Sequence, residues 1–105
     1  LRFSFDNQKA VVSFDIETHD EVFREYYYDK FVSLKNLLKA EISEDIILEK
    51  DFLRSSGKII SRVYITKVDV NIHNKKNWPE VFEFFYENMP KFELFWYEYE
   101  DIIKA

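Results

Sequence analysis

The sequence contains no cysteine and only one glycine among its 105 residues. Without cysteine the chain has no disulfide, no thiolate nucleophile and no Cys-ligated zinc site. One glycine, Gly57, is too few for a phosphate-cradling loop or a dinucleotide-binding fingerprint. These absences remove several common enzyme classes. They also fit a reducing compartment, so we expect a cytoplasmic protein.

Long apolar runs and basic clusters are also scarce. The apolar runs are only a few residues long, so no segment is expected to span a membrane, and no secretory signal pattern is present. Acidic residues outnumber basic ones by 20 to 15, which gives a net charge of −5. Because phosphate neutralisation supplies most of the affinity for nucleic acids, this balance disfavours a nucleic-acid binder.

Aromatic residues, in contrast, are abundant, at 19% of the chain. Together with 47% hydrophobic and 33% charged residues, they indicate one ordered domain over residues 1–105. The first residue is Leu1 rather than Met, and it already fits a strand pattern. We therefore expect the domain to lack an N-terminal helix or strand segment.

Two alternating patterns near the N-terminus predict a β-hairpin. Apolar and polar residues alternate from Leu1 to Phe5, and Asp6-Asn7 then has typical turn chemistry. In the second strand the inward row is Ala10, Val12, Phe14 and Ile16.

A helix of about 20 residues is predicted next. Thr18 and Glu21 have the spacing of a capping box. The apolar stripe that follows, ending near Ala40, consists of Phe23, Tyr27, Phe31, Leu34 and Leu38.

A second hairpin follows this helix. One strand runs from Ile46 toward Phe52 and the other from Lys58 to about Thr66. The turn between them contains Gly57, which supplies the positive φ that such turns need.

The last third of the chain predicts two helices. Asn77 and Glu80 form a second capping pattern after an extended connector. Pro90 has no amide hydrogen and clashes with the preceding turn, so we expect the helix to break or kink there. The resulting order ββαββαα predicts an α+β fold with two layers, in which helices cover one face of an antiparallel sheet built from two hairpins.

Asp15, Glu17 and His19 are the strongest candidates for chemistry. On an extended strand they share one face with Ser13, and two carboxylates with an imidazole could hold Mg²⁺ or Mn²⁺. We favour the alternative, the solvated face of a half-buried strand, because no lysine follows at the spacing of a metal-dependent nuclease. His73 is expected to be an exposed loop residue without a nucleophile beside it. We therefore predict no catalytic residue, no metal and no cofactor.

Arg62 and the surplus aromatic residues suggest an interaction surface instead. Arg62 lies in mid-strand, where it could clamp an anion or, as we expect, pair with Glu80 or Glu83. Aromatic residues exceed what one core needs, and Tyr and Trp are favoured at the centres of interfaces. For each of them we favour a role in the core, and a partner surface is the alternative. The possible interaction residues are Arg62, Tyr64, Trp78, Trp96 and Tyr97.

Five stretches together resemble one family of bacterial proteins. They are residues 10–17 (AVVSFDIE), 61–64 (SRVY), the connector 68–72, Trp78-Pro79, and 90–96. The chain is similar in them to domain-of-unknown-function family 4268. This resemblance implies a bacterial domain that is sometimes attached to nuclease-like domains, and it implies no catalytic residues. Stand-alone members usually begin with a further helix and strand.

We therefore expect a non-enzymatic domain for protein interaction or self-association, with a homodimer or another protein as partner. The alternative is an accessory module of a nuclease or restriction-type system. That module would contact nucleic acid through a local basic patch of Arg54, Lys58, Lys75 and Lys76. A contiguous basic face would favour nucleic acid, and an apolar face would favour a protein partner.

Overall fold

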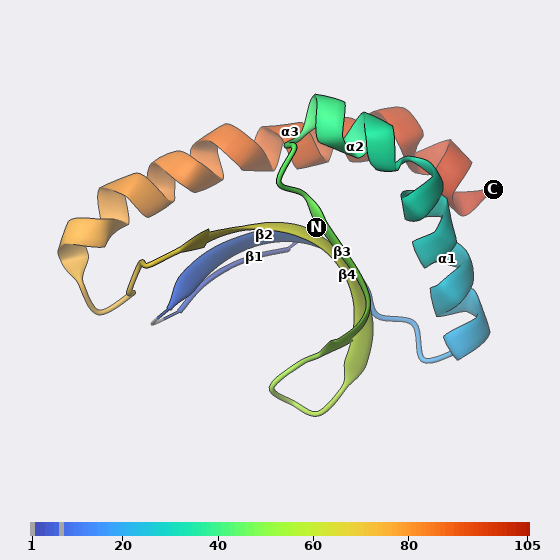
Figure 1. The fold of residues 1–105 in the computed structure, drawn as a ribbon, viewed down its shortest axis with the longest axis horizontal. Coiled ribbons are helices and arrows are strands. Elements are labelled where there is room, and N and C mark those ends of the chain that lie inside the picture. The colour runs from blue at the N-terminus through green and yellow to red at the C-terminus, as the bar shows by residue number, and fades with distance from the viewer. Residues whose placement is uncertain (1, 7) are drawn as a thin grey trace.

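The structure, a computed structural model, describes residues 2–6 and 8–105. Figure 1 shows a four-stranded antiparallel sheet with helices on one face, which confirms the predicted α+β class. The features predicted at Leu1 and Asn7 lie outside the described residues. The elements in chain order are β1 (Arg2–Phe5), β2 (Lys9–Ile16), α1 (Glu21–Ser33), α2 (Lys35–Glu41), β3 (Ile47–Leu53), β4 (Ile59–Val68), the 3-10 turn η1 (Lys75–Asn77) and α3 (Trp78–Lys104).

The sheet consists of the two predicted hairpins placed side by side. Its strand order is β1-β2-β4-β3, so the hairpins meet where β2 pairs with β4. This central pairing runs from Lys9 opposite Val68 to Ile16 opposite Ser61. The register of β3 on β4 shifts between Glu49 and Phe52, which marks a β-bulge in that edge strand.

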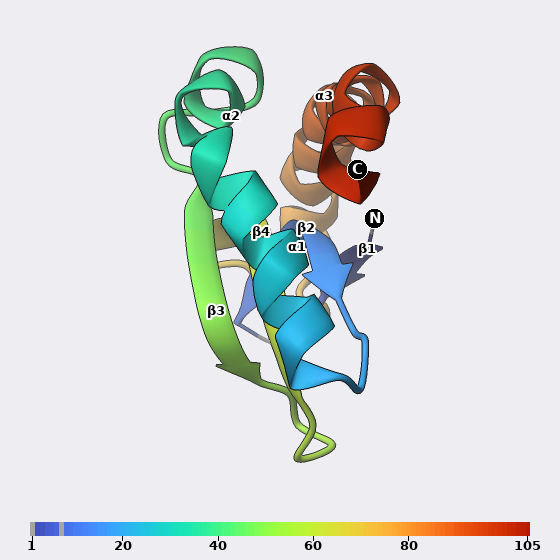
Figure 2. The ribbon, with the colours of Figure 1, turned by 90° about the vertical axis from the view of Figure 1, so that its right-hand side faces the viewer.

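The sheet is strongly arched, and the helices lie on its convex side. Figure 1 shows α3 spanning the top of the arch and α1 running down one flank. Figure 2, turned by 90°, shows α3 over the β1–β2 side and α1 with α2 over the β3–β4 side. The concave face carries no helix in either view.

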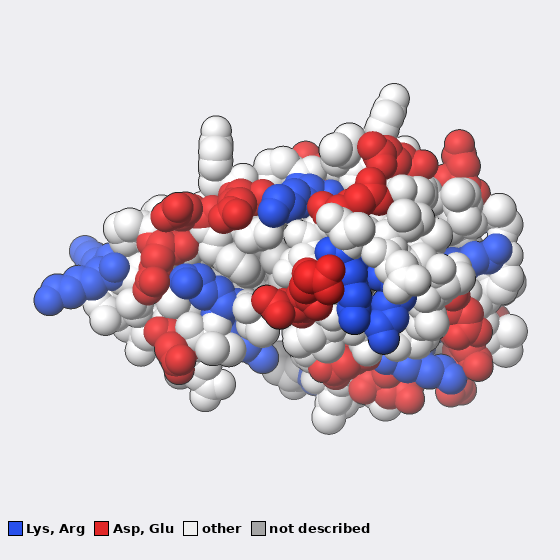
Figure 3. Space-filling view, turned by 45° about the horizontal axis from the view of Figure 1, so that its top comes forward, with Lys and Arg blue, Asp and Glu red and all other residues white. Residues whose placement is uncertain are grey.

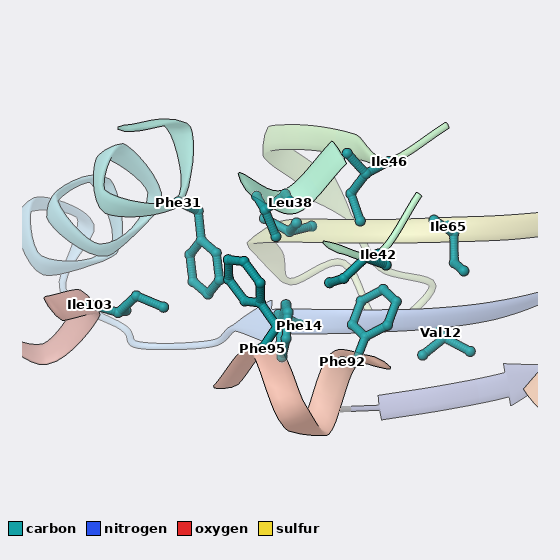
Figure 4. Close-up of a cluster of buried hydrophobic side chains, with 11 residues drawn as sticks. Val12, Phe14, Phe31, Leu38, Ile42, Ile46, Ile65, Phe92, Phe95 and Ile103 are labelled. Carbon is teal, nitrogen blue, oxygen red and sulfur yellow. The ribbon is translucent and has the colours of Figure 1, made fainter. Parts of the chain in front are cut away.

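Phe14 of β2 lies at the centre of the main core (Figure 4). Its ring centroid is 4.9 Å from that of Phe92 and 5.4 Å from that of Phe31, so strand, α3 and α1 meet at this side chain. The inward row predicted for β2 is confirmed by the burial of Val12 and Phe14. The buried members of the core are Val12, Phe14, Phe31, Leu38, Ile42, Ile46, Val63, Ile65, Phe92, Phe95 and Ile103.

The predicted 20-residue helix is interrupted at Leu34, so the structure contains α1 and α2 instead. The Ser33 hydroxyl donates to the carbonyl of Lys30 at 2.6 Å, a local bond of the kind that competes with helix continuation. The break turns the chain around the arch, so that Phe31 and Leu38 both reach the core.

The first turn of α1 also differs from the prediction. Asp20, not Thr18, is the N-cap, and its carboxylate accepts from the amides of Val22 and Phe23. Phe23 is exposed, whereas its neighbour Arg24 is buried.

From the break or kink expected at Pro90 we predicted two helices in the C-terminal region, and this prediction is wrong. The structure has one helix of 27 residues, so the order of the elements is ββααββα with η1 ahead of α3. Pro90 lies on the exposed side of α3, where the carbonyl that it leaves without an amide partner can be hydrated. The helix therefore continues and follows the arch of the sheet (Figure 1).

Candidate interaction surfaces

Asp15 and Arg62 form the centre of the concave face. They lie opposite each other on β2 and β4, and Arg62 donates from Nε and Nη2 to the two carboxylate oxygens at 2.8 and 3.0 Å. Ser13 adds a third bond to Asp15, at 2.8 Å from its hydroxyl. The Asp15 side chain is only 2% exposed, so this is a buried, fully hydrogen-bonded ion pair.

Further ion pairs extend from this centre toward the rim. Glu17 accepts from Arg2 of β1 and from Arg54 at the end of the second hairpin. These bonds link the two hairpins across the concave face. They also occupy the arginines with acidic partners of the same chain.

Aromatic side chains close the other side of the concave face. The guanidinium of Arg62 lies 4.1 Å from the ring centroid of Phe52, and Phe52 contacts Tyr64 with centroids 6.0 Å apart. The Tyr64 hydroxyl donates to Glu49. Burial, aided by this bond to the carboxylate, raises the pKa of Tyr64 to about 12.

This geometry corrects two expectations. The strand face with Asp15 is not simply solvated, because the Asp15 side chain is buried, although Glu17 and His19 are exposed. Arg62 pairs with Asp15 and not with Glu80 or Glu83, since it points to the concave face while α3 covers the convex one. Within residues 2–6 and 8–105, no three side chains of His, Asp and Glu gather so that they could hold a metal ion.

A second buried polar cluster, centred on Arg24, was missed at the sequence level. The β-bulge leaves the carbonyl of Lys50 outside the regular ladder, and this carbonyl accepts from Arg24 at 2.5 Å and from the Ser61 hydroxyl at 2.6 Å. Arg24 also donates to Ser61 and pairs with Asp51 at 3.1 Å. The apolar periodicity of α1 placed Phe23 on the inward side, but periodicity does not reveal the bulge whose carbonyl Arg24 binds.

An exposed apolar surface lies along the flank of α3 that is next to β1. Phe3 packs edge-on against Phe85 with ring centroids 5.3 Å apart, and Phe85 lines a shallow groove of about 340 Å³. We call this surface the β1/α3 face, and its members are Phe3, Phe82, Phe85, Tyr86, Met89 and Pro90. Tyr86 is 86% exposed, and Phe3 and Phe82 are each 57% exposed.

A larger cavity, of about 700 Å³, opens between the end of β2, α1 and the last turns of α3. We call it the end pocket. Its apolar lining is Phe14, Ile16, Tyr27, Phe31, Trp96 and Ile103. Asp15, Glu17, Thr18 and Lys104 add polar groups to the lining, and Lys104 forms an ion pair with Glu100 at 3.0 Å.

The five possible interaction residues are distributed over different parts of the molecule. Arg62 and Tyr64 lie on the concave face, where each is tied to an acidic residue. Trp78 begins α3 and donates its indole N–H to the carbonyl of Ile72 at 2.7 Å. Trp96 lines the end pocket, and Tyr97 is 83% exposed on α3. The structure therefore does not bring the five together.

The four basic residues that could contact nucleic acid in a nuclease-associated module do not form one patch. Arg54 and Lys58 flank the turn between β3 and β4, whereas Lys75 and Lys76 lie in η1, and Figure 1 draws the turn at the bottom of the molecule and the segment before α3 at its left. On the face drawn in Figure 3, lysines and arginines are interleaved with acidic residues. No helix of the described chain is long and apolar enough to cross a membrane.

The comparison with protein families decides the membership of the chain. The model of the family described as "Domain of unknown function (DUF4268)" matches residues 1–100 of its 105 residues. The chain belongs to the DUF4268 family. The resemblance found in the sequence is thereby confirmed. No curated protein and no solved structure matches this DUF4268 chain.

Proposed function

We propose that this DUF4268 chain is a non-enzymatic, cytoplasmic protein-interaction domain of bacteria that self-associates through the β1/α3 face. The observation that carries the proposal is that an exposed aromatic groove adjoins β1, with which no further strand of the described residues pairs on its outer side. Exposed apolar patches next to an open edge are typical of protein contact sites.

The two edges of the sheet differ in a way that favours β1. The β3 edge is interrupted by its bulge, and its Lys50 pairs with Glu25 at 3.2 Å. Bulges and charged side chains are the usual means by which proteins protect an edge from pairing. β1 pairs with β2 in regular register from Arg2 to Phe5 and presents Phe3 beside its outer edge.

The size of the apolar surface suits the centre of a dimer interface. A whole aromatic side chain presents about 200 Å², so Phe3, Phe82 and Tyr86 together expose on the order of 400 Å² at their exposed fractions of 57, 57 and 86%. A stable interface removes about 800 Å² from each partner. The edge of β1 and the flanking groove would supply the remainder.

A second copy of the chain is the occupant that this surface fits best. Two β1 strands related by a two-fold axis would pair antiparallel and join two four-stranded sheets into one. Each α3 would then bring its Phe82 and Tyr86 to the same contact. Each copy carries a net charge of −5, but among the residues that the structure describes Glu93 is the one charged side chain that lines the apolar groove.

The proposal is tested by light scattering of the wild-type protein at tens of micromolar. We expect about twice the 12.9 kDa mass of one chain. Tyr86→Glu should give the monomer mass, because it places a charge in the apolar contact. Val22→Glu is the matched control, since Val22 is 75% exposed but lies on α1, and it should remain dimeric.

Two results would contradict self-association through this face. One is a monomeric wild-type protein throughout this concentration range, and the other is a dimer that Tyr86→Glu leaves intact. A further arm adds a DNA duplex at low salt, where phosphate contacts are strongest. Micromolar binding of the duplex would favour the nuclease-associated alternative instead.

A further inference from the structure

The net charge of the protein is concentrated on α3. This helix has seven acidic residues and two lysines, whereas the rest of the chain has thirteen acidic and thirteen basic residues. The excess of negative charge therefore belongs to α3 alone. In Figure 3 acidic side chains are spread along the upper edge of the molecule, where α3 lies.

The C-terminal half of α3 presents two apolar side chains to solvent. Leu94 is 57% and Tyr97 is 83% exposed, and their spacing of three residues places them side by side on the helix surface. Exposed carboxylates flank them, because Glu98 follows Leu94 by four residues and Asp101 follows Tyr97 by four.

A further carboxylate reaches this surface from α2. Glu41 is the last residue of α2 and shares a hydrogen bond with Glu98. Desolvation, this bond and the charge of Glu41 raise the pKa of Glu98 above its ordinary value, as expected where two carboxyl groups meet. We call this surface the outer patch, and its members are Glu41, Leu94, Tyr97, Glu98 and Asp101.

The negative charge of the outer patch is not compensated within the part of the chain that the structure describes. Both lysines of α3 are paired on the helix itself, Lys91 with Glu87 at 3.9 Å and Lys104 with Glu100 at 3.0 Å. No described basic side chain forms an ion pair with an acidic member of the patch. A cation brought to this surface would therefore relieve the repulsion between its carboxylates.

We propose that the outer patch binds a basic amphipathic helix of a partner protein. The partner helix lies along α3 and packs its apolar stripe on Leu94 and Tyr97. Its arginines flank this stripe and pair with the surrounding carboxylates, and one of them stacks on the exposed ring of Tyr97. This is recognition of a helix through its apolar face, with charge setting the choice of partner.

The charge of the patch indicates this occupant. A second copy would bring the same carboxylates to the contact, and like charges oppose such docking. A nucleic acid is disfavoured for the same reason. An uncharged helix would cover the apolar pair but leave the carboxylates beside it without partners. A basic helix satisfies the apolar and the acidic groups together.

The outer patch is separate from the β1/α3 face. No member of the outer patch belongs to that face or lines its groove. The monomeric variant Tyr86→Glu should therefore bind a basic helix as the wild type does. A monomeric wild-type protein that binds the helix would contradict self-association and still support the present proposal.

The probe is a blocked, fluorescein-labelled peptide of three heptads Ala-Arg-Leu-Ala-Ala-Leu-Arg. In a helix these heptads place arginines on both sides of a leucine stripe. Fluorescence anisotropy of the peptide is measured as the protein is added. We expect saturable binding that weakens about tenfold when the ionic strength rises from about 0.05 to 0.5 M, because salt screens exposed charges. A peptide with Glu in place of each Arg should not bind.

A pair of tyrosine variants locates the apolar part of the contact. Tyr97→Ala should weaken the binding about tenfold, a typical loss for an aromatic residue at the centre of an interface. Tyr86→Ala is the matched control, because Tyr86 is 86% exposed on the same helix but belongs to the β1/α3 face. It should leave the binding unchanged.

A pair of double variants locates the acidic part. Glu98→Gln with Asp101→Asn should weaken the binding about tenfold and reduce its dependence on salt. The control with the same change of charge is Glu21→Gln with Asp29→Asn, two exposed positions on α1. This control should bind like the wild type.

Several results would overturn the proposal. They are the absence of saturable binding, and equal losses in the two members of either pair of variants. Equal binding of a peptide with the same composition, but with its leucines spread around the helix, would also overturn it, because the patch would then attract positive charge alone. A wild-type dimer that Tyr97→Arg dissociates would make a second copy the occupant and would overturn it too.

Discussion

Both faces of the sheet are largely buried, but different groups shield them from solvent. The convex face carries an apolar cluster that α1, α2 and α3 cover. The concave face has no helix over it, yet Val11 is 4%, Ser13 1% and Ile60 0% exposed. The sheet curves around this face, and the side chains of Arg62 and Phe52, with their contact partners, cover these residues and keep water away from them.

This difference shows how a single-layered face can exclude water. Apolar packing on the convex face is non-directional and needs a second layer. On the concave face the long side chain of Arg62 covers apolar neighbours while its head stays bonded to Asp15. Such a face depends on each polar group having its partner, because an unpaired buried charge is strongly destabilising.

The largest effect is expected on the convex face. Phe92 is fully buried and contacts Phe14, so Phe92→Ala should lower the free energy of unfolding by about 3–5 kcal/mol. Tyr97→Ala on the exposed side of the same helix should change it by less than about 0.5 kcal/mol. Urea denaturation followed by circular dichroism measures both. Equal effects would mean that the orientation of α3 is wrong.

On the concave face we expect the effects of substituting Asp15 and Arg62 on the free energy of unfolding to be non-additive. Asp15→Leu leaves Arg62 without its carboxylate and should cost about 3 kcal/mol, whereas Asp15→Leu with Arg62→Met should recover much of that loss. The control pair is Glu87 and Lys91 on exposed α3, where coupling should be below about 0.5 kcal/mol. Additive losses at Asp15 and Arg62 would contradict the account of this face.

The smallest effect is the pH dependence contributed by Tyr64. Its pKa of about 12 in the folded protein exceeds the ordinary value of 10.0, so folding favours the protonated phenol. This contribution is present below about pH 10 and is lost as the pH rises toward 12. A hydrogen bond to Glu41 likewise raises the pKa of Tyr99 to about 12, so both tyrosines contribute in the same pH range. The contribution of Tyr64 is therefore obtained by comparing wild type with Tyr64→Phe.

At neutral pH we expect Tyr64→Phe to be less stable than wild type by about 1 kcal/mol, the usual net value of a hydrogen bond. This difference in the free energy of unfolding should disappear between pH 10 and 12 in urea titrations of both proteins. A gap that stays constant with pH would show that Glu49 does not accept from the Tyr64 phenol.

The strands and their inward row could be predicted because alternation is a local property of the sequence. The turn at Gly57 could be predicted for the same reason, and its φ is 87°. Alternation assigns residues to the two faces of the sheet. It does not show whether the curvature of the sheet buries side chains on a face that no helix covers. For this reason Asp15 was placed among solvated residues although it is buried.

The differences in the helices and sites have tertiary causes. Leu34 interrupts one helix and Pro90 fails to interrupt another, because in both places the chain follows the arch of the sheet. The pairing of Arg62 with Asp15 depends on the β2–β4 register, which joins strands 47 residues apart. The family, in contrast, could be recognised from short stretches of sequence.

The central functional proposal is that β1, the edge strand of the sheet among the described residues, is the contact between copies, and that the concave face is not. Hydrogen exchange of the backbone amides at low and high protein concentration tests it most directly. We predict that exchange at residues 2–5 slows as concentration rises, together with protection of residues 82–90, while residues 60–66 of β4 keep the same rates. Exchange in β1 that is independent of concentration, or new protection confined to the concave face, would contradict the claim.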